Sequence, residues 1–269
     1  MRAALALALA TMQSMSRYPA QYVGGAISPV LWVLPTWMMV VHARALGLEQ
    51  SFAEATGLSS EMALLYLFLG ALYWNYVEGV WGVALYIRQS MVNGTLEALW
   101  ATPASRLSLV IGWSLGRLLG ITLHSAVAFS LLLALGWRLP RLPWIPAVAV
   151  LVLSVLAAYG FAFLLAGLSL RFRDDGAAVT LLGNAAPLLG GVIFPVLLLP
   201  QPLRLLSYLF PFTYGADALR GILLGSRTLL PLPTELALVA AMGLLLPLGG
   251  WAVFSRLEAL ARRQGLDGF

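Results

Sequence analysis

The chain has 269 residues, of which 61% are hydrophobic and only 10% are charged, and its net charge is +5. Soluble domains carry about 25% charged residues, so this composition excludes an ordinary soluble protein and indicates an integral membrane protein. The absence of cysteine excludes disulfides and thiolate chemistry, and the only two histidines, His42 and His124, lie too far apart in sequence to suggest a zinc site.

All sixteen basic residues are arginines. A conventional nucleotide-binding P-loop needs a lysine on the phosphates, so this chain cannot contain one. If ATP drives its work, the ATPase must be a separate chain, and ATP and magnesium would bind to that chain. We expect no cofactor on this chain. The arginines are spread along the sequence, which favours basic loops beside a membrane over nucleic-acid binding.

Residues 1–17 are rich in Ala, Leu and Met and are flanked by Arg2 and Arg17, a pattern shared by signal peptides and by amphipathic helices on a membrane surface. Because hydrophobicity does not stop before the next segment, the interfacial helix is favoured. Residues 18–41 are uncharged and long enough for a span, which takes about 20 residues. A short polar loop is expected at 44–61.

Later apolar stretches predict five more spans, which completes an all-α, six-span membrane domain over residues 18–255. Glu78 lies within the second span, and Arg117 and His124 lie within the third. Ionisable groups inside spans are functional candidates because their exposure to lipid is costly, although Glu78 also fits a structural pair with Arg117. The five spans are expected near 62–87, 110–135, 146–170, 177–199 and 236–255.

The segment 88–106, between the second and third spans, is amphipathic. Asn93 and Gly94 form a turn signal, and Pro103 disfavours helix at the residue before it. We therefore expect a short helix at 95–101, lying on the membrane surface or docked in a partner's groove. Its apolar face consists of Val92, Leu96, Leu99 and Trp100.

Residues 202–225 differ from the spans because polar residues and proline divide them into pieces too short to cross a bilayer. Two short helices that enter the membrane and return fit this pattern. We expect Asp217 in the first turn of the second helix, where the helix dipole favours an anion, and paired with Arg220 three residues later.

Six spans place both termini on one side of the membrane. Assigning that side to the cytoplasm gives nine arginines inside and six outside, which favours this orientation in the inner (plasma) membrane. The segment 88–106 and the tail 256–269 are then cytoplasmic, and the short helices of 202–225 lie on the outer face.

Three stretches within residues 75–255 resemble the permease subunits of type-2 ATP-binding-cassette (ABC-2) exporters, which include bacterial drug exporters. Residues 93–106, NGTLEALWATPASR, resemble the family's segment after the second span. Residues 191–200, GVIFPVLLLP, resemble the end of its fifth span, and residues 210–220, FPFTYGADALR, resemble its segment before the last span.

The resemblance implies a dimer with a second permease copy or paralogue, two ATPase subunits docked beneath it, and contact with membrane lipid. It also implies that residues 1–17 form the interfacial connecting helix and that outer helices cap the exit path, with Pro211, Tyr214, Asp217 and Arg220 in the second of them. The ATPase-coupling residues that it implies are Gly94, Thr95, Leu96, Glu97, Leu99, Trp100, Thr102 and Pro103.

The favoured function is ATP-driven export of an amphipathic or hydrophobic small molecule by alternating access. Residues 171–174, RFRD, are also similar to polysaccharide-export permeases, which keeps lipid-linked glycan export open. A different class is a proton-coupled secondary transporter using Glu78, Arg117 and His124. An enzyme using Asp174 and Asp175 has the least support because the sequence offers no nucleophile–base pair or metal-ligand spacing.

Overall fold

The structure is a computed structural model that describes residues 49–94, 106–134, 136, 143–172 and 177–263. It also describes eight single positions, each helical and exposed: Leu9, Gln13, Arg17, Gly24, Ile27, Leu31, Met38 and Val41. Apart from these positions, the predicted interfacial helix and first span lie outside the described residues. So do the predicted helix at 95–101 and residues 264–269.

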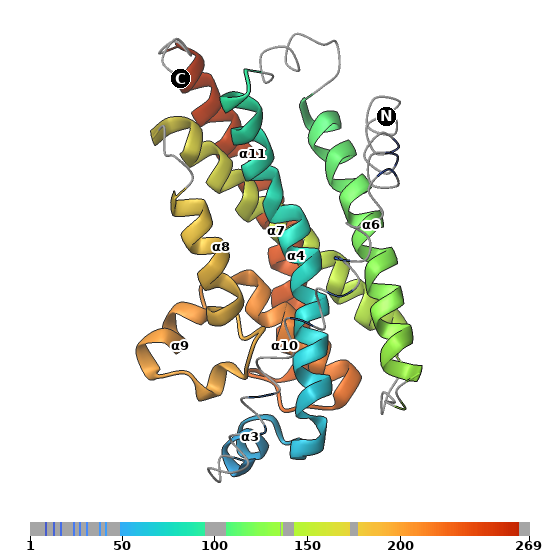
Figure 1. Cartoon of the computed structure of the whole chain (residues 1–269). Helices are drawn as coiled ribbons and strands as arrows, with labels where there is room; N and C mark the ends of the chain where they lie inside the picture. Colours follow the sequence, from blue (N-terminus) through green and yellow to red (C-terminus); the bar gives the residue numbers. More distant parts are fainter. Residues whose placement is uncertain are drawn as a thin grey trace.

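Every regular element in these ranges is helical, which confirms the predicted all-α class. Four long helices run the length of the molecule (Figure 1): α4 (Ala63–Val92), α6 (Arg106–Ala134), α7 (Trp144–Phe172) and α11 (Leu232–Arg263). The shorter α-helices are α3 (Glu49–Thr56), α8 (Ala177–Leu189), α9 (Gln201–Ser207) and α10 (Pro211–Leu224). Two single 3-10 turns lie at Ser60–Met62 and Val196–Leu198.

Three of the described helices are long and apolar enough to cross a membrane. A fourth span is obtained if Gln50–Thr56 and Ser60–Gly82, which meet at a bend of 77°, are counted together. These segments correspond to the predicted second, third, fourth and sixth spans, so the chain is an integral membrane protein. The three long segments are Ile111–Ala134, Trp144–Gly167 and Leu232–Leu260.

The predicted fifth span, 177–199, differs from the structure because α8 ends at Leu189 after only 13 residues. Pro187 inside the helix lacks a backbone donor, which weakens the last turn. Gly191 then adopts a left-handed φ of 69°, and Pro195 continues in an extended conformation. The chain therefore turns back toward α9 instead of continuing as helix.

The predicted polar loop 44–61 also differs, because part of it is the helix α3. The ring of Phe52 packs edge-on against the ring of Tyr66 in α4, with 5.6 Å between centroids. The backbone N–H of Arg227 donates to the carbonyl of Thr56 at 2.6 Å, which ties α3 to the loop before α11. Tertiary contacts therefore stabilise a helix where the local sequence suggested an exposed loop.

The core lies where α4, α7, α10 and α11 meet. Helices α7 and α11 pack along each other, and the ring of Phe163 contacts those of Trp251 and Phe254 at 5.2 and 5.9 Å. The ring of Phe212 in α10 meets Trp74 at 5.7 Å and Phe161 at 5.9 Å. Helix α10 is thus an interior element surrounded by the long helices.

The two ends of the molecule carry different elements (Figure 1). Helices α3 and α9 lie at one end, and the C-terminal ends of α4 and α11 lie at the other, next to the start of α6. The described margins of 88–106 and the end of α11 therefore share one end of the molecule, while α9 lies toward the other; which end faces the cytoplasm stays a prediction.

Candidate functional site

The predicted ATPase-coupling segment is described only at its margins. Helix α4 ends at Val92, and the exposed residues Asn93 and Gly94 form a turn in which Gly94 has a φ of 65°. The structure thereby confirms the predicted turn, and α6 begins again at Arg106. The remaining coupling residues lie outside the described ranges and stay predictions: Thr95, Leu96, Glu97, Leu99, Trp100, Thr102 and Pro103.

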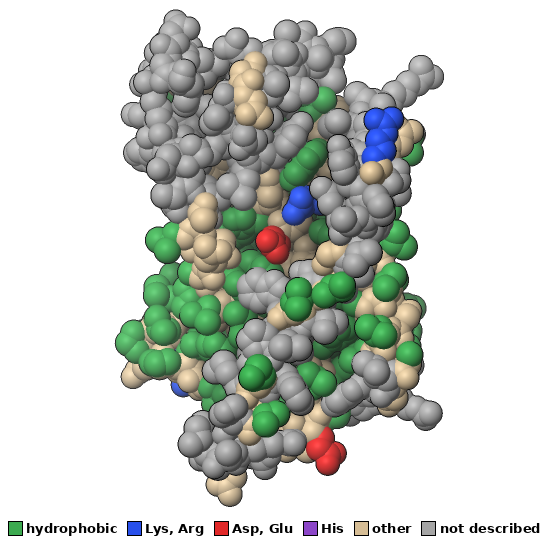
Figure 2. Space-filling view, in the orientation of Figure 1, with side chains coloured by type: hydrophobic (Ala, Val, Ile, Leu, Met, Phe, Trp, Pro, Cys, Tyr) green, Lys and Arg blue, Asp and Glu red, His purple; other side chains and the backbone are tan. Residues whose placement is uncertain are grey.

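Two charged side chains, Glu78 of α4 and Arg117 of α6, lie on the surface halfway along the long helices. The positive charge of Arg117 acts on the Glu78 carboxyl, and its guanidinium carbon lies 5.7 Å from the ring centroid of Trp113. Figure 2 shows an acidic and a basic side chain near each other in the middle of this face. Within the described residues no direct ion pair joins Glu78 to Arg117, so they are charged neighbours rather than a closed salt bridge.

His124, the third polar candidate, lies seven residues after Arg117 on α6. Seven residues are about two helical turns, so the two side chains share one face of the helix. Arg117 and His124 therefore form a polar line along this side of α6, with about two helical turns between them.

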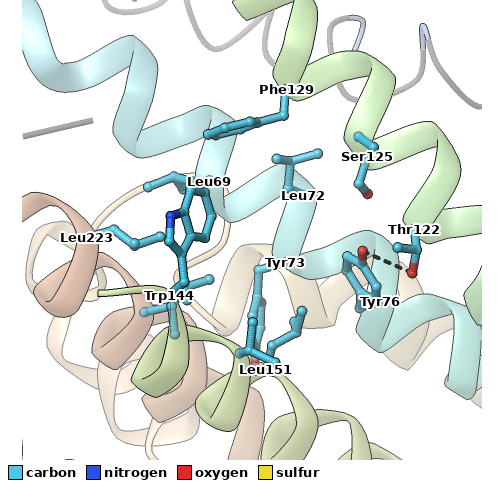
Figure 3. A pocket seen from close by; sticks show the side chains of 14 residues that line it. Leu69, Leu72, Tyr73, Tyr76, Thr122, Ser125, Phe129, Trp144, Leu151 and Leu223 are labelled. Atoms are coloured by element: carbon cyan, nitrogen blue, oxygen red, sulfur yellow. Dashed lines mark hydrogen bonds between the residues drawn. The ribbon is translucent and has the colours of Figure 1, made fainter. Parts of the chain in front are cut away.

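A cavity of about 270 Å³ lies between α4, α6, α7 and α10 (Figure 3). At one corner the hydroxyl of Tyr76 donates to that of Thr122 at 3.3 Å, with Ser125 beside them. Most of the remaining lining is apolar. The lining residues are Leu69, Leu72, Tyr73, Tyr76, Thr122, Ser125, Ala126, Phe129, Trp144, Ala147, Val148, Leu151, Leu219 and Leu223.

Arg220 is 1% exposed and is held by backbone oxygens instead of a carboxylate. Its Nε–H donates to the carbonyl of Tyr66 at 3.0 Å. Its two terminal nitrogens donate to the carbonyls of Gly191 and Val192 at 2.6 and 2.7 Å. The guanidinium carbon also lies 3.8 Å from the centroid of the Tyr66 ring, a cation–π contact. Arg220 therefore joins α10 to α4 and to the segment that follows α8.

Gly70 makes room for this arrangement. A side chain at this position would overlap the Nη2 atom of Arg220 and the carbonyl oxygen of Val192. The absence of a side chain on one face of α4 thus allows the arginine and the irregular segment to approach the helix backbone.

The predicted pairing of Asp217 with Arg220 is wrong. Helix α10 begins at Pro211, a residue favoured in the first turn, so Asp217 is the seventh helical residue and not in the first turn. Its Oδ2 accepts the backbone N–H of Leu229 at 2.7 Å, while Arg220 points to the carbonyls. The long-range acceptors outcompete the local pair because they satisfy three guanidinium donors together.

Asp217 instead faces Glu235, at the start of α11, and the two carboxyls make a side-chain contact. Burial raises the pKa of Asp217, an effect opposed by the Leu229 N–H and the charge of Arg220. Glu235 is 0% exposed, and no donor among the described residues makes a hydrogen bond to either of its carboxyl oxygens. Two adjacent buried carboxylates would repel each other, so we expect Asp217 and Glu235 to share a proton.

The start of α10 is fixed by hydrogen bonds to the turn before it. The hydroxyl of Tyr214 donates to the carbonyl of Tyr208 at 3.0 Å, and that of Thr213 donates to the carbonyl of Ser207 at 2.8 Å. Pro211 is buried at the first position of the helix. Two short helices, α9 and α10, thus precede the last span, while their predicted entry into the membrane from the outer face stays a prediction.

Sequence reasoning singled out neither the cavity nor Glu235. Fourteen residues from four helices form the cavity, and their packing leaves no one-dimensional signal. Glu235 follows the proline-containing run PLPT, which marks a helix start, and an acidic residue there is common because the helix dipole favours it. Within the described ranges, no group of three or more metal-ligating residues lies close enough to hold a metal ion.

Residues 2–224, which are 223 of the 269, match the protein family described as ABC-2 type transporter. A comparison with curated proteins finds no match. The family match agrees with the long apolar helices. It also includes the three segments that resemble the family in sequence, residues 93–106, 191–200 and 210–220. Such permeases form the membrane component of transporters whose ATPase is a separate subunit or domain. The chain therefore belongs to the ABC-2 type transporter family, as a membrane permease that works with an ATP-binding-cassette ATPase.

Proposed function

We propose that this permease exports an amphipathic or hydrophobic small molecule from the cytoplasm across the inner (plasma) membrane. Two ATPase subunits dock on the cytoplasmic side, where both termini lie, and ATP hydrolysis drives alternating access. The observation that carries the transport path is the exposed pair Glu78 and Arg117 on two long helices.

A charged side chain at the centre of a span costs roughly 2.5–3.5 kcal/mol on insertion scales. Glu78 and Arg117 are exposed, and no direct ion pair within the described residues neutralises them. Facing lipid would therefore be unfavourable for this side of α4 and α6. A second permease copy or paralogue covers it, and the polar line along α6 borders the path between the two subunits.

The charges on this path set limits on the cargo. The described spans present one acidic and one basic group there, so the path has no strong preference for either sign. The surrounding helices are apolar and contain many aromatic residues. A molecule with a large apolar body and a small polar or zwitterionic group suits this combination.

Coupling to the ATPase is assigned to residues 95–101. The turn at Gly94 and the restart of helix at Arg106 place both margins of this segment at the end of the molecule opposite α9. A short amphipathic helix there, with Leu96, Leu99 and Trp100 on one face, has the form of a docking element.

The double change Leu96→Asp with Glu97→Arg tests this proposal. We expect the variant to insert into membranes but to lose co-purification of the ATPase and ATP-dependent transport, because docking needs the apolar face. Leu209→Asp, which adds a charge at an exposed position near the opposite end, serves as the control and should keep both activities.

Retention of ATPase binding and transport by the double variant would refute the docking role. In the wild type, transport should continue with ATP after the proton gradient is collapsed. Loss of transport under that condition would instead support a proton-coupled transporter.

A further inference from the structure

The cavity between α4, α6, α7 and α10 opens sideways on the surface of α6 and α7. Four of its lining residues, Thr122, Ala126, Trp144 and Val148, are exposed, whereas Tyr73 and Ala147 are buried. The surface around the opening is a belt of exposed apolar side chains on two spanning helices, so the opening faces the lipid side of the molecule. This belt includes Leu119, Leu123, Val127 and Val152.

The walls and the volume of the cavity indicate an apolar occupant. An apolar cavity of about 150 Å³ stays dry and binds molecules such as benzene. The volume here is about 270 Å³, larger than that reference case, and its walls are mainly Leu, Val, Ala and aromatic side chains. Water has too few polar partners in such a space, so hydrocarbon is the favourable filling.

Two hydroxyls in the wall, those of Tyr73 and Ser125, have no hydrogen-bond partner among the described residues. Ser125 is 8% exposed and lies beside the hydroxyls of Tyr76 and Thr122, which bond to each other. Figure 3 shows these three side chains grouped at one side of the cavity. A buried hydroxyl is unfavourable when unpaired, so Ser125 has a donor available for an oxygen on the occupant.

The occupant meets no charged side chain among the lining residues. Glu78 and Arg117 project from the faces of α4 and α6 opposite those that line the cavity, as the 3.6-residue period of the two helices requires. The cavity is thus separate from the proposed transport path. It is continuous instead with the lipid-facing belt.

We propose that the cavity binds one acyl chain of a bilayer phospholipid, with an ester carbonyl oxygen accepting the hydroxyl of Ser125. The chain enters between α6 and α7, and its charged headgroup stays outside the apolar walls. Its inner part contacts Leu219 and Leu223 of α10, the helix that Arg220 anchors. A bound lipid therefore supports the interior helix on a face next to the one that carries Arg220.

A pair of adjacent substitutions on α6 tests occupancy. Ala126 and Val127 are both exposed, but only Ala126 lines the cavity. The purified protein, in detergent, is incubated with a phosphatidylcholine that carries a photoactivatable diazirine in one acyl chain, and the labelled peptides are mapped. Ala126→Trp should lower labelling of peptides from α6 and α7 by about tenfold, which corresponds to about 1.4 kcal/mol of binding free energy. Val127→Trp should leave the labelling unchanged.

Equal labelling in the two variants would overturn the proposal. If Ala126→Trp does not fold, Ser125→Ala decides the question, because it removes one hydroxyl at little change in volume. The wild type should prefer the ester-linked probe to its ether-linked analogue, and Ser125→Ala should abolish that preference while the exposed control Ser130→Ala keeps it. No preference in the wild type would overturn the assignment of the carbonyl.

A transported molecule that displaces the probe from the wild type would show that the cavity is a cargo site, and this outcome also contradicts the lipid assignment. Failure of the transport proposal would leave the labelling result unaffected, because the labelling requires no ATPase and no transport.

Discussion

Arg220 shows how a single cation can be kept inside a membrane protein without a carboxylate. The planar guanidinium presents its donors in a fixed fork, and three carbonyl oxygens and the face of Tyr66 match that geometry. A lysine ammonium is compact and cannot reach three acceptors placed around a flat group. The site is therefore specific for arginine and not for positive charge alone.

Arg220→Lys should destabilise the protein by about 2–5 kcal/mol, since hydrogen bonds to charged groups contribute about 1.5–3 kcal/mol each and most of them would be lost. Thermal unfolding of the purified permease in detergent measures the change. Arg256→Lys, at an exposed position on α11, is the matched control and should unfold like the wild type. Equal stability of the two variants would show that charge alone is sufficient at position 220.

Sequence reasoning identified Arg220 as a notable residue but not its partners. Its acceptors lie 28, 29 and 154 residues away, and they are backbone oxygens, which carry no residue-type signal. The local rule for residues three apart on a helix instead suggested Asp217. Side-chain spacing could predict which face Arg220 occupies but could not predict which distant segment meets that face.

At the scale of elements, Asp217 of α10 and Glu235 of α11 lie at the contact between the interior helix and the last span, where we expect their carboxyls to share a proton. The charged and titratable groups that act on the pair are Arg220, Tyr66 and Tyr214, besides the two carboxyls themselves. With a shared proton, the folded state keeps at neutral pH a proton that the same two carboxyls, exposed in the unfolded chain, have already released. Because the native state binds more protons than the unfolded state, stability falls as pH rises.

Glu235→Gln should remove this pH dependence, because the amide supplies a permanent donor to Asp217 in place of the shared proton. We expect the melting temperature of the wild type to decrease from neutral to alkaline pH and that of the variant to change less. Glu258→Gln is the comparison, since Glu258 is a second buried acid of α11 and lies more than twenty residues from the pair. Parallel pH profiles for the wild type and Glu235→Gln would contradict the shared proton.

For α4, α6, α7 and α11, the length of the hydrophobic stretches and the positions of the prolines predicted a helix and its approximate position. The same rules divided 202–225 into two short helices, as found. They were less accurate for α8 and α3. The residues after Leu189 are apolar and were predicted to continue the helix, but Gly191 adopts a left-handed conformation that turns the backbone. Helix α3 depends on contacts with Tyr66 and Arg227, which are distant in sequence and give no local pattern.

For the whole molecule, the proposed function requires the side that carries Glu78 and Arg117 to face another subunit and not lipid. Glu78→Leu distinguishes the two environments. On a lipid-facing surface the change would stabilise the protein and leave transport intact, whereas on the proposed path it should reduce transport without impairing insertion. Transport by proteoliposomes containing the ATPase measures the effect.

The charged pair itself can be tested with Glu78→Gln, Arg117→Gln and the double variant. If the two groups act together, the double variant should lose no more transport than the more impaired single variant, because effects at coupled sites do not add. Additive losses would indicate two independent contributions. Leu123→Gln, in the lipid-facing belt of α6, controls for a new amide in a spanning helix.

The anchoring of Arg220 also has a consequence for the order of assembly during synthesis. All three of its acceptor carbonyls precede it in the chain, and those of Gly191 and Val192 belong to the non-helical segment after α8. When Gly191 and Val192 are synthesised, Arg220 has not yet been added to the chain. Their carbonyls therefore gain this partner only after α10 has been made, and the segment after α8 cannot take its anchored form before then.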